Sequence, residues 1–340
     1  MEFSSSKMNH GPKSNEKVGY RSNDYKEKIS TFPKGKGWLS DEVHHYQGFW
    51  YNFFNLEGLL IAHEHFKPQP NDIILSSAPK SGTTWLKALS FAIVTRSSFD
   101  ASTNPLLTTM PHECVLSLES DLAHISFHRN LDTPLVGTHV PYTSLPKSII
   151  DSRCKIIYIC RDPMDAFVSL WHFLRKASHK GVEPSAREDA EFEEAFKLFC
   201  DGVSYFGPYW DHVLGYWSAS LQSPDKVLFL KYEDLKNDTV FYVKKMAEFM
   251  GYPFSLEEEG KGMVQKIVDL SFKNLSKLEV NKSGRLHDRP YAIEKNAFFR
   301  KGEIGDWKNH LTPMMAAHLD QIIEQKLINS GLTLNAPSKA

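Results

Sequence analysis

Residues 71–85 read NDIILSSAPKSGTTW, and this stretch decides the fold because an apolar run leads directly into a loop of glycine and hydroxyl residues. Ile73 to Leu75 is predicted to be a buried strand, and apolar residues from Trp85 to Ile93 recur at helical spacing. Residues 78–85 would then lie at the start of a helix, where backbone amides point outward and carry partial positive charge. We therefore expect this loop to bind an anion.

The composition of the loop favours a phosphate. Gly82 lets the backbone approach a ligand closely, the hydroxyl groups of Ser81, Thr83 and Thr84 add donors, and Lys80 supplies a full charge. A bare Gly-Thr-Thr helix start can equally be simple capping, but the whole PKSGTTW string favours the phosphate. The triphosphate loop GxxxxGK[ST] is not matched, because Lys80 precedes Gly82, so an ATPase or a kinase is disfavoured.

Further apolar runs predict the rest of the sheet. Besides 73–75, we expect strands at 135–137, 155–160 and 227–230. We expect helices at about 48–66, 163–176, 208–221, 239–250 and 313–327. Buried strands separated by helices indicate an α/β fold with a parallel sheet covered on both faces. The chain contains no internal repeat and no interdomain linker, so we expect one domain over residues 36–335, preceded by a disordered polar tail over residues 1–35.

The composition of the whole chain argues against several classes of protein. Its 40 Lys and Arg residues nearly balance 41 Asp and Glu residues, so it lacks the basic field of a nucleic-acid binder. No apolar stretch is long enough for a membrane helix, and the first 30 residues contain no secretory signal. None of the 4 cysteines has zinc-site spacing. We expect free thiols, no metal, no nucleic-acid or membrane partner, and a cytoplasmic location.

Five blocks of the chain resemble, in the same order, those of the cytosolic sulfotransferases, and the sequence between them resembles the plant flavonol-sulfotransferase-like branch, which belongs to plant secondary metabolism. The blocks are KSGTTW at 80–85, THVP at 138–141, CRDP at 160–163, KYED at 231–234 and RKG at 300–302. The resemblance spans about residues 45–330. It implies a central five-stranded parallel sheet with nucleotide-kinase-like, P-loop-like topology. It also implies transfer of a sulfuryl group from 3′-phosphoadenosine 5′-phosphosulfate (PAPS) to a hydroxyl group of a small molecule, with PAP as the second product.

The resemblance also assigns roles to individual residues. Lys80 to Trp85 would wrap the 5′-phosphosulfate, with Lys80 stabilising charge on the bridging oxygen and Trp85 stacking on the adenine. The 3′-phosphate would be bound by Arg161, Ser169, Arg300, Lys301 and Gly302. The adenine would also contact Tyr232, Ser271 and Phe272.

A hydroxyl group that attacks sulfur must lose its proton, and histidine is the side chain best matched to that task near neutral pH. Among 15 histidines, the resemblance singles out His139 as the base, because it follows the 135–137 strand in the THVP block. Many animal members have a lysine at the position of Gly137, so we expect no second cation there. The animal dimer motif is not matched around Lys308 and Thr312, and a monomer is favoured over a dimer.

The acceptor stays open at this point. Six aromatic residues suggest a flat, apolar pocket, although each could equally belong to the core: Phe49, Trp50, Tyr51, Tyr142, Phe173 and Tyr205. A flavonol-like compound, a steroid, a hydroxyjasmonate or a desulfoglucosinolate would each fit. The rival interpretations are a nucleotide-kinase-like phosphotransferase and a nucleotide-binding protein without catalysis. The first lacks its GK[ST] loop, and the presence of both Lys80 and His139 argues against the second.

Overall fold

The centre of the protein is a parallel β-sheet. A computed structural model describes residues 22–40, 42–100, 102–122, 133–178, 188–286 and 293–334. Within these residues the sheet has the order β5-β4-β6-β7, and every neighbouring pair is parallel. Its strands are β4 (Ile73–Ser77), β5 (Leu135–Thr138), β6 (Lys155–Cys160) and β7 (Val227–Lys231).

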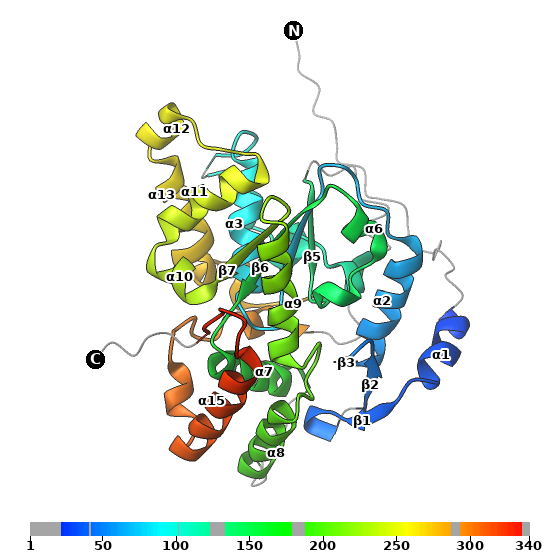
Figure 1. Cartoon of the computed structure of the whole chain (residues 1–340). Coiled ribbons are helices and arrows are strands. Elements are labelled where there is room, and N and C mark those ends of the chain that lie inside the picture. Colours follow the sequence, from blue (N-terminus) through cyan, green and yellow to red (C-terminus); the bar gives the residue numbers. More distant parts are fainter. Residues whose placement is uncertain are drawn as a thin grey trace.

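Helices cover both faces of this sheet (Figure 1). The longer helices are α2 (Phe53–His65), α3 (Thr83–Thr95), α7 (Pro163–Ser178), α8 (Glu188–Cys200), α9 (Tyr209–Gln222), α11 (Thr239–Met250) and α15 (Pro313–Leu327). The shorter ones are α1 (Ser22–Ser30), α4 (Pro111–Cys114), α6 (Lys147–Asp151), α10 (Tyr232–Asn237), α12 (Leu256–Gly260), α13 (Met263–Val268), the π-helical turn η4 (Asp269–Lys273) and α14 (Glu279–Lys282). Two small antiparallel sheets are formed by β1 (Lys34–Lys36), β2 (Glu42–Tyr46) and β3 (Phe49–Tyr51), and by β8 (Arg285–Leu286) and β9 (Ile293–Glu294).

Alternate residues of the parallel strands enter two separate cores. Ile74 and Ile156 pack with residues of α2, α7 and α9 on one face. Ile73 and Ile157 pack with residues of α3, α11 and α13 on the other face. Because side chains of a strand point alternately to opposite faces, a strand buried on both faces must be apolar at every position. This explains the continuous apolar runs, and it leaves the ends of the strands for polar side chains.

The four strands predicted from the sequence, and the parallel sheet that they form, are confirmed. The resemblance implied five strands, whereas the described residues place four in this sheet. Beyond β5, a single parallel bridge pairs Ser117 with Gly137. The open edge of β5 is therefore extended by one residue pair rather than by a regular strand.

Two predictions near the N-terminus differ from the structure. The helix expected over 48–66 begins only at Phe53, where the side chain of Asn52 accepts a hydrogen bond from the backbone of Asn55 at 2.8 Å. The three aromatic residues before it, 49–51, form β3, because their alternating burial suits a strand against β2.

The expected disordered tail differs from the structure at residues 22–36. Residues 22–30 form α1 and residues 34–36 form β1, while residues 1–21 lie outside the described residues. Tyr25 and Ile29 are buried, and the hydroxyl of Tyr25 donates to Glu64 at 2.6 Å. These two positions are four residues apart, so they share one face of the helix. The polar composition of the whole segment did not indicate this apolar face.

Candidate functional site

The carboxyl ends of the four parallel strands bring the predicted site residues to one edge of the sheet. In sheet order, β5 is followed by His139, β4 by the loop 78–82, β6 by Arg161 and β7 by Tyr232. Ligands of open parallel sheets bind at this edge, outside the carboxyl ends of the strands. Residues separated by more than 90 positions in the sequence thus become neighbours in space.

The loop after β4 has the backbone geometry of an anion-binding turn. Lys80 and Gly82 have positive φ angles of 65° and 112°, so the chain turns sharply before α3 begins at Thr83. A Cβ atom at Gly82 would lie 2.9 Å from Tyr232 Cδ2, so only glycine fits there. The hydroxyl groups of Ser77 and Thr83 are hydrogen-bonded at 2.6 Å. No side chain caps the start of α3, so its first amides remain available to a ligand.

Lys80 lies beside two aromatic rings. Its Nζ is 4.2 Å from the ring centroid of Phe173 and 5.5 Å from that of Phe298. Burial, together with the nearby positive charges of Arg161 and Arg300, lowers the pKa of Lys80 to about 7. An anion bound at the loop would favour the charged form of this lysine.

Tyr232 occupies a position between two other site residues. Its ring is stacked on Trp85 with centroids 4.8 Å apart, and the guanidinium carbon of Arg161 is 4.6 Å from the same ring. Two groups cannot share one face, so both faces of Tyr232 are covered, and only its edge could meet an adenine. The hydroxyl of Tyr232 donates to the carbonyl of Gly302 at 2.9 Å. This tyrosine therefore links the phosphate loop to the 300–302 segment.

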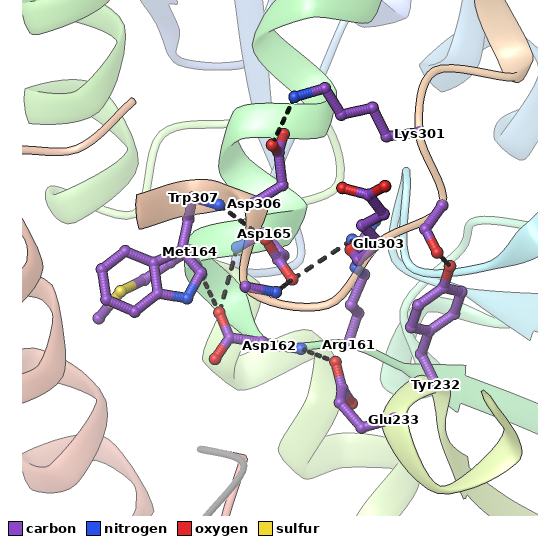
Figure 2. Close-up of polar contacts among 12 residues, drawn as sticks. Arg161, Asp162, Met164, Asp165, Tyr232, Glu233, Lys301, Glu303, Asp306 and Trp307 are labelled. Carbon is purple, nitrogen blue, oxygen red and sulfur yellow. Dashed lines mark hydrogen bonds and ion pairs between the residues drawn. The ribbon is translucent and has the colours of Figure 1, made fainter. Parts of the chain in front are cut away.

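Figure 2 shows how the segment after residue 302 is held against the start of α7. Arg161 donates to the carbonyl of Glu303 and lies 3.3 Å from the carboxylate of Asp165. Asp165 in turn accepts from the backbone of Gly305 at 2.7 Å and of Trp307 at 3.0 Å. A carboxylate on α7 thus fixes a segment that lies 140 positions later in the sequence.

Arg300 and Lys301 share one buried carboxylate. Both form ion pairs with Asp306, with the Lys301 Nζ at 2.7 Å. Burial alone would raise the pKa of Asp306, but hydrogen bonds from Lys301, Arg300 and Asn309 hold it well below its usual range. The Nε atoms of Arg161 and Arg300 are buried and have no hydrogen-bond partner among the described residues. Buried donors of this kind are satisfied when an anion binds between them.

The remaining predicted nucleotide contacts lie on helices around this edge. Ser169 is buried on α7 four positions before Phe173, so both share the helix face that reaches Lys80. Ser271 lies in the π-helical turn η4, which packs against α3. Its hydroxyl is fully buried and has no partner in the described part of the chain. The side chain of Phe272 lies outside the described residues.

His139 is held in one tautomer. Its Nδ1 lies 2.8 Å from the carbonyl oxygen of Ser77, which can only accept, so Nδ1 carries a proton, and the neutral form of the ring has its lone pair on Nε2. The backbone N–H of His139 donates to Glu119 at 2.9 Å, and its carbonyl accepts from His212 at 2.8 Å. The imidazole is therefore oriented as a base.

The groups behind His139 are buried and hydrogen-bonded to one another or to the histidine. Glu119 also accepts from the Thr138 hydroxyl at 2.9 Å, and burial raises the pKa of Glu119. Burial lowers the pKa of His212 to about 4, so it is neutral, and its other nitrogen is hydrogen-bonded to the Tyr158 hydroxyl at 2.9 Å. Sequence reasoning missed Glu119 and His212, because neither lies in a recognisable motif.

A small apolar pocket lies between the phosphate loop and residues 204–209. Its wall includes Pro79, Leu170, Phe199, Tyr205 and Phe206. The ring of one wall residue, Phe206, is 5.6 Å from that of His139. Of the six aromatic residues named from the sequence, only Tyr205 lines this pocket, while Phe173 lies beside Lys80 and the others pack elsewhere.

Two acidic residues next to Arg161 have structural partners of their own. Asp162 caps α7 by accepting from the backbone of Met164 at 2.9 Å and of Asp165 at 3.1 Å, and Asp165 anchors the 305–307 segment. Within the described residues, no group of three His, Cys, Asp or Glu side chains is arranged to hold a metal ion. Nor is any helix of the described residues both long and apolar enough to cross a membrane.

Comparison with known proteins identifies the family. The family model described as "Sulfotransferase domain" matches residues 70–331. The chain belongs to the sulfotransferase family. A flavonol sulfotransferase-like protein of Flaveria bidentis is 49% identical over 311 residues, which cover 90% of this chain and 98% of the relative. Cytosolic sulfotransferase 16 of Arabidopsis thaliana is 47% identical over 314 residues, covering 91% of each chain.

Solved structures agree with this family and with the fold. A sulphotransferase from Arabidopsis thaliana has a TM-score of 0.71 and 38% identity, covering 91% of this chain and 94% of its own. Mouse sulfotransferase SULT7A1, solved with PAP, has a TM-score of 0.61 and 27% identity, covering 85% of this chain and 96% of its own. This sulfotransferase is thus an enzyme of the plant cytosolic type.

The sulfotransferase brings most of the predicted residues together at the sheet edge. Residues 80–85, Arg161, Tyr232, His139 and the 300–302 segment meet there, although Arg300 and Lys301 pair with Asp306. Sequence reasoning did not single out Asp306, and only its tertiary contacts identify it. Asp165 could have been found, because an acid four residues after Arg161 suits an ion pair across one helical turn.

Proposed function

We propose that this sulfotransferase moves a sulfuryl group from PAPS to a hydroxyl group of a flat, apolar molecule of the flavonol class. The observation that carries this proposal is the oriented imidazole of His139 beside the loop at 80–85, which begins at Lys80 and leads into an uncapped helix start. A base and an anion site at one edge of a sheet suit the transfer of an anionic group to a hydroxyl.

The donor is supported by two cationic regions of the site. The loop at 80–85 suits the 5′-phosphosulfate, and the Nε atoms of Arg161 and Arg300, buried without partners among the described residues, suit a second phosphate. The mouse relative solved with PAP supports the same nucleotide.

The chemical step is an in-line displacement at sulfur. The acceptor oxygen forms a bond to sulfur while its proton moves to Nε2 of His139, and the bond from sulfur to the bridging phosphate oxygen breaks. Charge accumulates on that bridging oxygen, and the ammonium of Lys80 stabilises it. The products are the sulfate ester, PAP and protonated His139, which then releases its proton to water.

The pocket and the relatives support the acceptor class. The apolar wall with Tyr205 and Phe206 suits an aromatic or similarly flat compound, and the contact between Phe206 and His139 supports an acceptor bound near the base. The flavonol sulfotransferase-like relative, at 49% identity, supports a flavonol within this range.

The test is transfer of ³⁵S from labelled PAPS to a panel of flavonols, steroids, hydroxyjasmonates and desulfoglucosinolates, with the His139→Ala protein as the control. We expect labelled product with flavonols, and its loss in the control. Product with another class would keep the reaction and replace the acceptor. No product from any class, together with tight PAP binding, would favour a nucleotide-binding protein without catalysis.

Location and assembly are inferred more indirectly. The cytosolic name of the Arabidopsis relative and four free cysteines in the structure support a reducing, cytoplasmic location. The monomer expected from the sequence stays a prediction, and light scattering during gel filtration measures it. A mass near 78 kDa, twice the 38.9 kDa of one chain, would contradict it.

A further inference from the structure

A buried chain of polar side chains runs beneath the phosphate loop. Lys87 on α3 is fully buried, and its Nζ lies 3.3 Å from Nδ1 of His112 on α4. Nε2 of the same histidine lies 3.1 Å from the hydroxyl of Thr84, in the first turn of α3. The chain therefore connects an interior cation to a hydroxyl group of the anion-binding turn.

The direction of these hydrogen bonds follows from the chemistry of the lysine. Lys87 also donates to the carbonyl of Val115 and to the hydroxyl of Ser117, each at 2.9 Å. An ammonium group can only donate, so Nδ1 of His112 must accept and the ring proton must lie on Nε2. That proton is then donated to the oxygen of Thr84. The hydroxyl proton of Thr84 must therefore point to another acceptor, and none is found among the described residues.

The neighbours of this chain hold it in place from both sides. A Cβ atom at Gly137 would lie 2.6 Å from Cε and 2.9 Å from Nζ of Lys87, so the lysine fills the space that a side chain on β5 would need. On the other side, the His112 ring packs against Phe298 with centroids 4.4 Å apart. Phe298 in turn lies beside Lys80. The histidine has little room to change its orientation.

We propose that Lys87 is a positioning residue that acts through His112 to aim the hydroxyl proton of Thr84 at the 5′-phosphosulfate of the donor. The proposal rests on the proposed function, because it takes PAPS as the ligand of the loop. In the empty protein the hydroxyl is already oriented, so binding does not have to order it. Position 137 is a glycine and carries no cation. Lys87 on α3 provides a cation nearby, which orients a hydrogen-bond donor and does not touch the substrate.

A simpler role for Lys87 would be to fill the core. A buried lysine is a costly filler, because an ammonium group must recover its lost hydration from acceptors, whereas methionine fills a similar volume without that cost. A filling role predicts that substitution lowers stability and leaves the discrimination between ligands unchanged. The positioning role predicts that the loss of affinity is confined to ligands with a 5′-phosphate.

The experiment measures binding of PAP and of adenosine 3′-phosphate, which lacks the 5′ group, by calorimetry. We expect Lys87→Met and Thr84→Val each to weaken PAP binding roughly tenfold, the size of one good hydrogen bond to a charged group, and to leave adenosine 3′-phosphate unchanged. The double variant should lose no more PAP affinity than Thr84→Val alone, because both substitutions act through one hydroxyl group. Thr84→Ser, which keeps the hydroxyl, should bind PAP nearly as the wild type does.

Lys226 provides a matched control. Its Nζ donates to the carbonyls of Ile149, Ile150 and Ser152, but it precedes β7, at the amino end of the sheet. Lys226→Met should lower the stability and leave PAP affinity unchanged. The positioning role would be overturned if the losses of PAP affinity were additive in the Lys87 and Thr84 double variant. Equal losses of affinity for PAP and for adenosine 3′-phosphate would also overturn it.

The tautomer of His112 gives a readout that does not depend on the donor. Long-range ¹⁵N–¹H spectra of the ¹⁵N-histidine-labelled full chain, without ligand, should show a protonated Nε2 and an unprotonated Nδ1. A proton on Nδ1 would overturn the proposal even if PAP binds tightly. If the tautomer is as expected but the wild type does not bind PAP, the proposed donor fails, and the role of Lys87 toward it fails with it.

Discussion

The end of the site around His139 and the end around Arg300 hold their key side chains by different means. His139 is fixed by hydrogen bonds to backbone groups and to Glu119, with the neutral ring of His212 behind it. Arg300 is fixed by an ion pair with a fully buried carboxylate, Asp306. One end relies on hydrogen bonds, and the other relies on ion pairs.

The difference reflects the two tasks of a group-transfer site. A base must be neutral before it reacts, so a cationic neighbour would lower its capacity to accept a proton. An anion site needs fixed positive charge, and the shared carboxylate keeps two cations close together without neutralising both.

The largest expected effect is at the end of the site around His139. His139→Ala should reduce turnover about 10²- to 10⁴-fold, because it removes the general base, while PAP affinity should change little. Steady-state kinetics with ³⁵S transfer, beside calorimetry with PAP, measure the two quantities. Turnover at the wild-type rate would show that another group accepts the proton.

At the charged end of the site, around Arg300, Arg300→Ala should weaken PAP binding roughly 10- to 100-fold, the expected range for a charge-assisted hydrogen bond. Binding of adenosine 5′-phosphate, which lacks the 3′-phosphate, should weaken much less. Calorimetry with both nucleotides makes the comparison. Equal losses for the two nucleotides would place Arg300 away from the 3′-phosphate.

Lys80 should make donor binding depend on pH. Its pKa of about 7 in the free protein rises when an anion binds, so above pH 7 binding takes up a proton. PAP affinity should therefore fall as the pH rises above 7, by at most about tenfold per pH unit. Calorimetry in two buffers of different ionisation enthalpy counts the protons. Lys80→Met should remove this proton uptake and weaken both PAP binding and turnover, and an unchanged uptake would assign it to another group.

The last expected effect is on the stability of the charged end. Asp306→Asn should lower the free energy of unfolding by about 2 kcal/mol at neutral pH, because it removes a buried partner of two cations. The pKa of Asp306 is depressed in the folded state, so its contribution is present above the unfolded value of about 4 and is lost as the pH falls below it. Urea unfolding of both proteins should therefore give a difference that is constant above about pH 5 and shrinks below about pH 4. A difference that grows in acid would contradict this account.

Local sequence was sufficient for the parts of the site that depend on neighbouring residues. The anion loop was predicted because Lys80, Gly82 and the helix after them are adjacent in the sequence, and their φ angles agree with a tight turn. The buried strands were predicted because a strand covered on both faces must be apolar throughout. The aromatic pocket was predicted poorly, because the core and the pocket contain the same types of aromatic residue.

The sequence by itself determined the parallel sheet, the turn that leads into α3 and the family, and it singled out His139 as the proposed base. Only the tertiary structure decided which acids hold the cations, which tautomer His139 adopts, and that Lys87 lies against Gly137 beneath the loop. The physical reason is that helices, strands and turns are set by contacts between near neighbours in the chain. Hydrogen-bond direction and charge pairing depend on groups that only folding brings together.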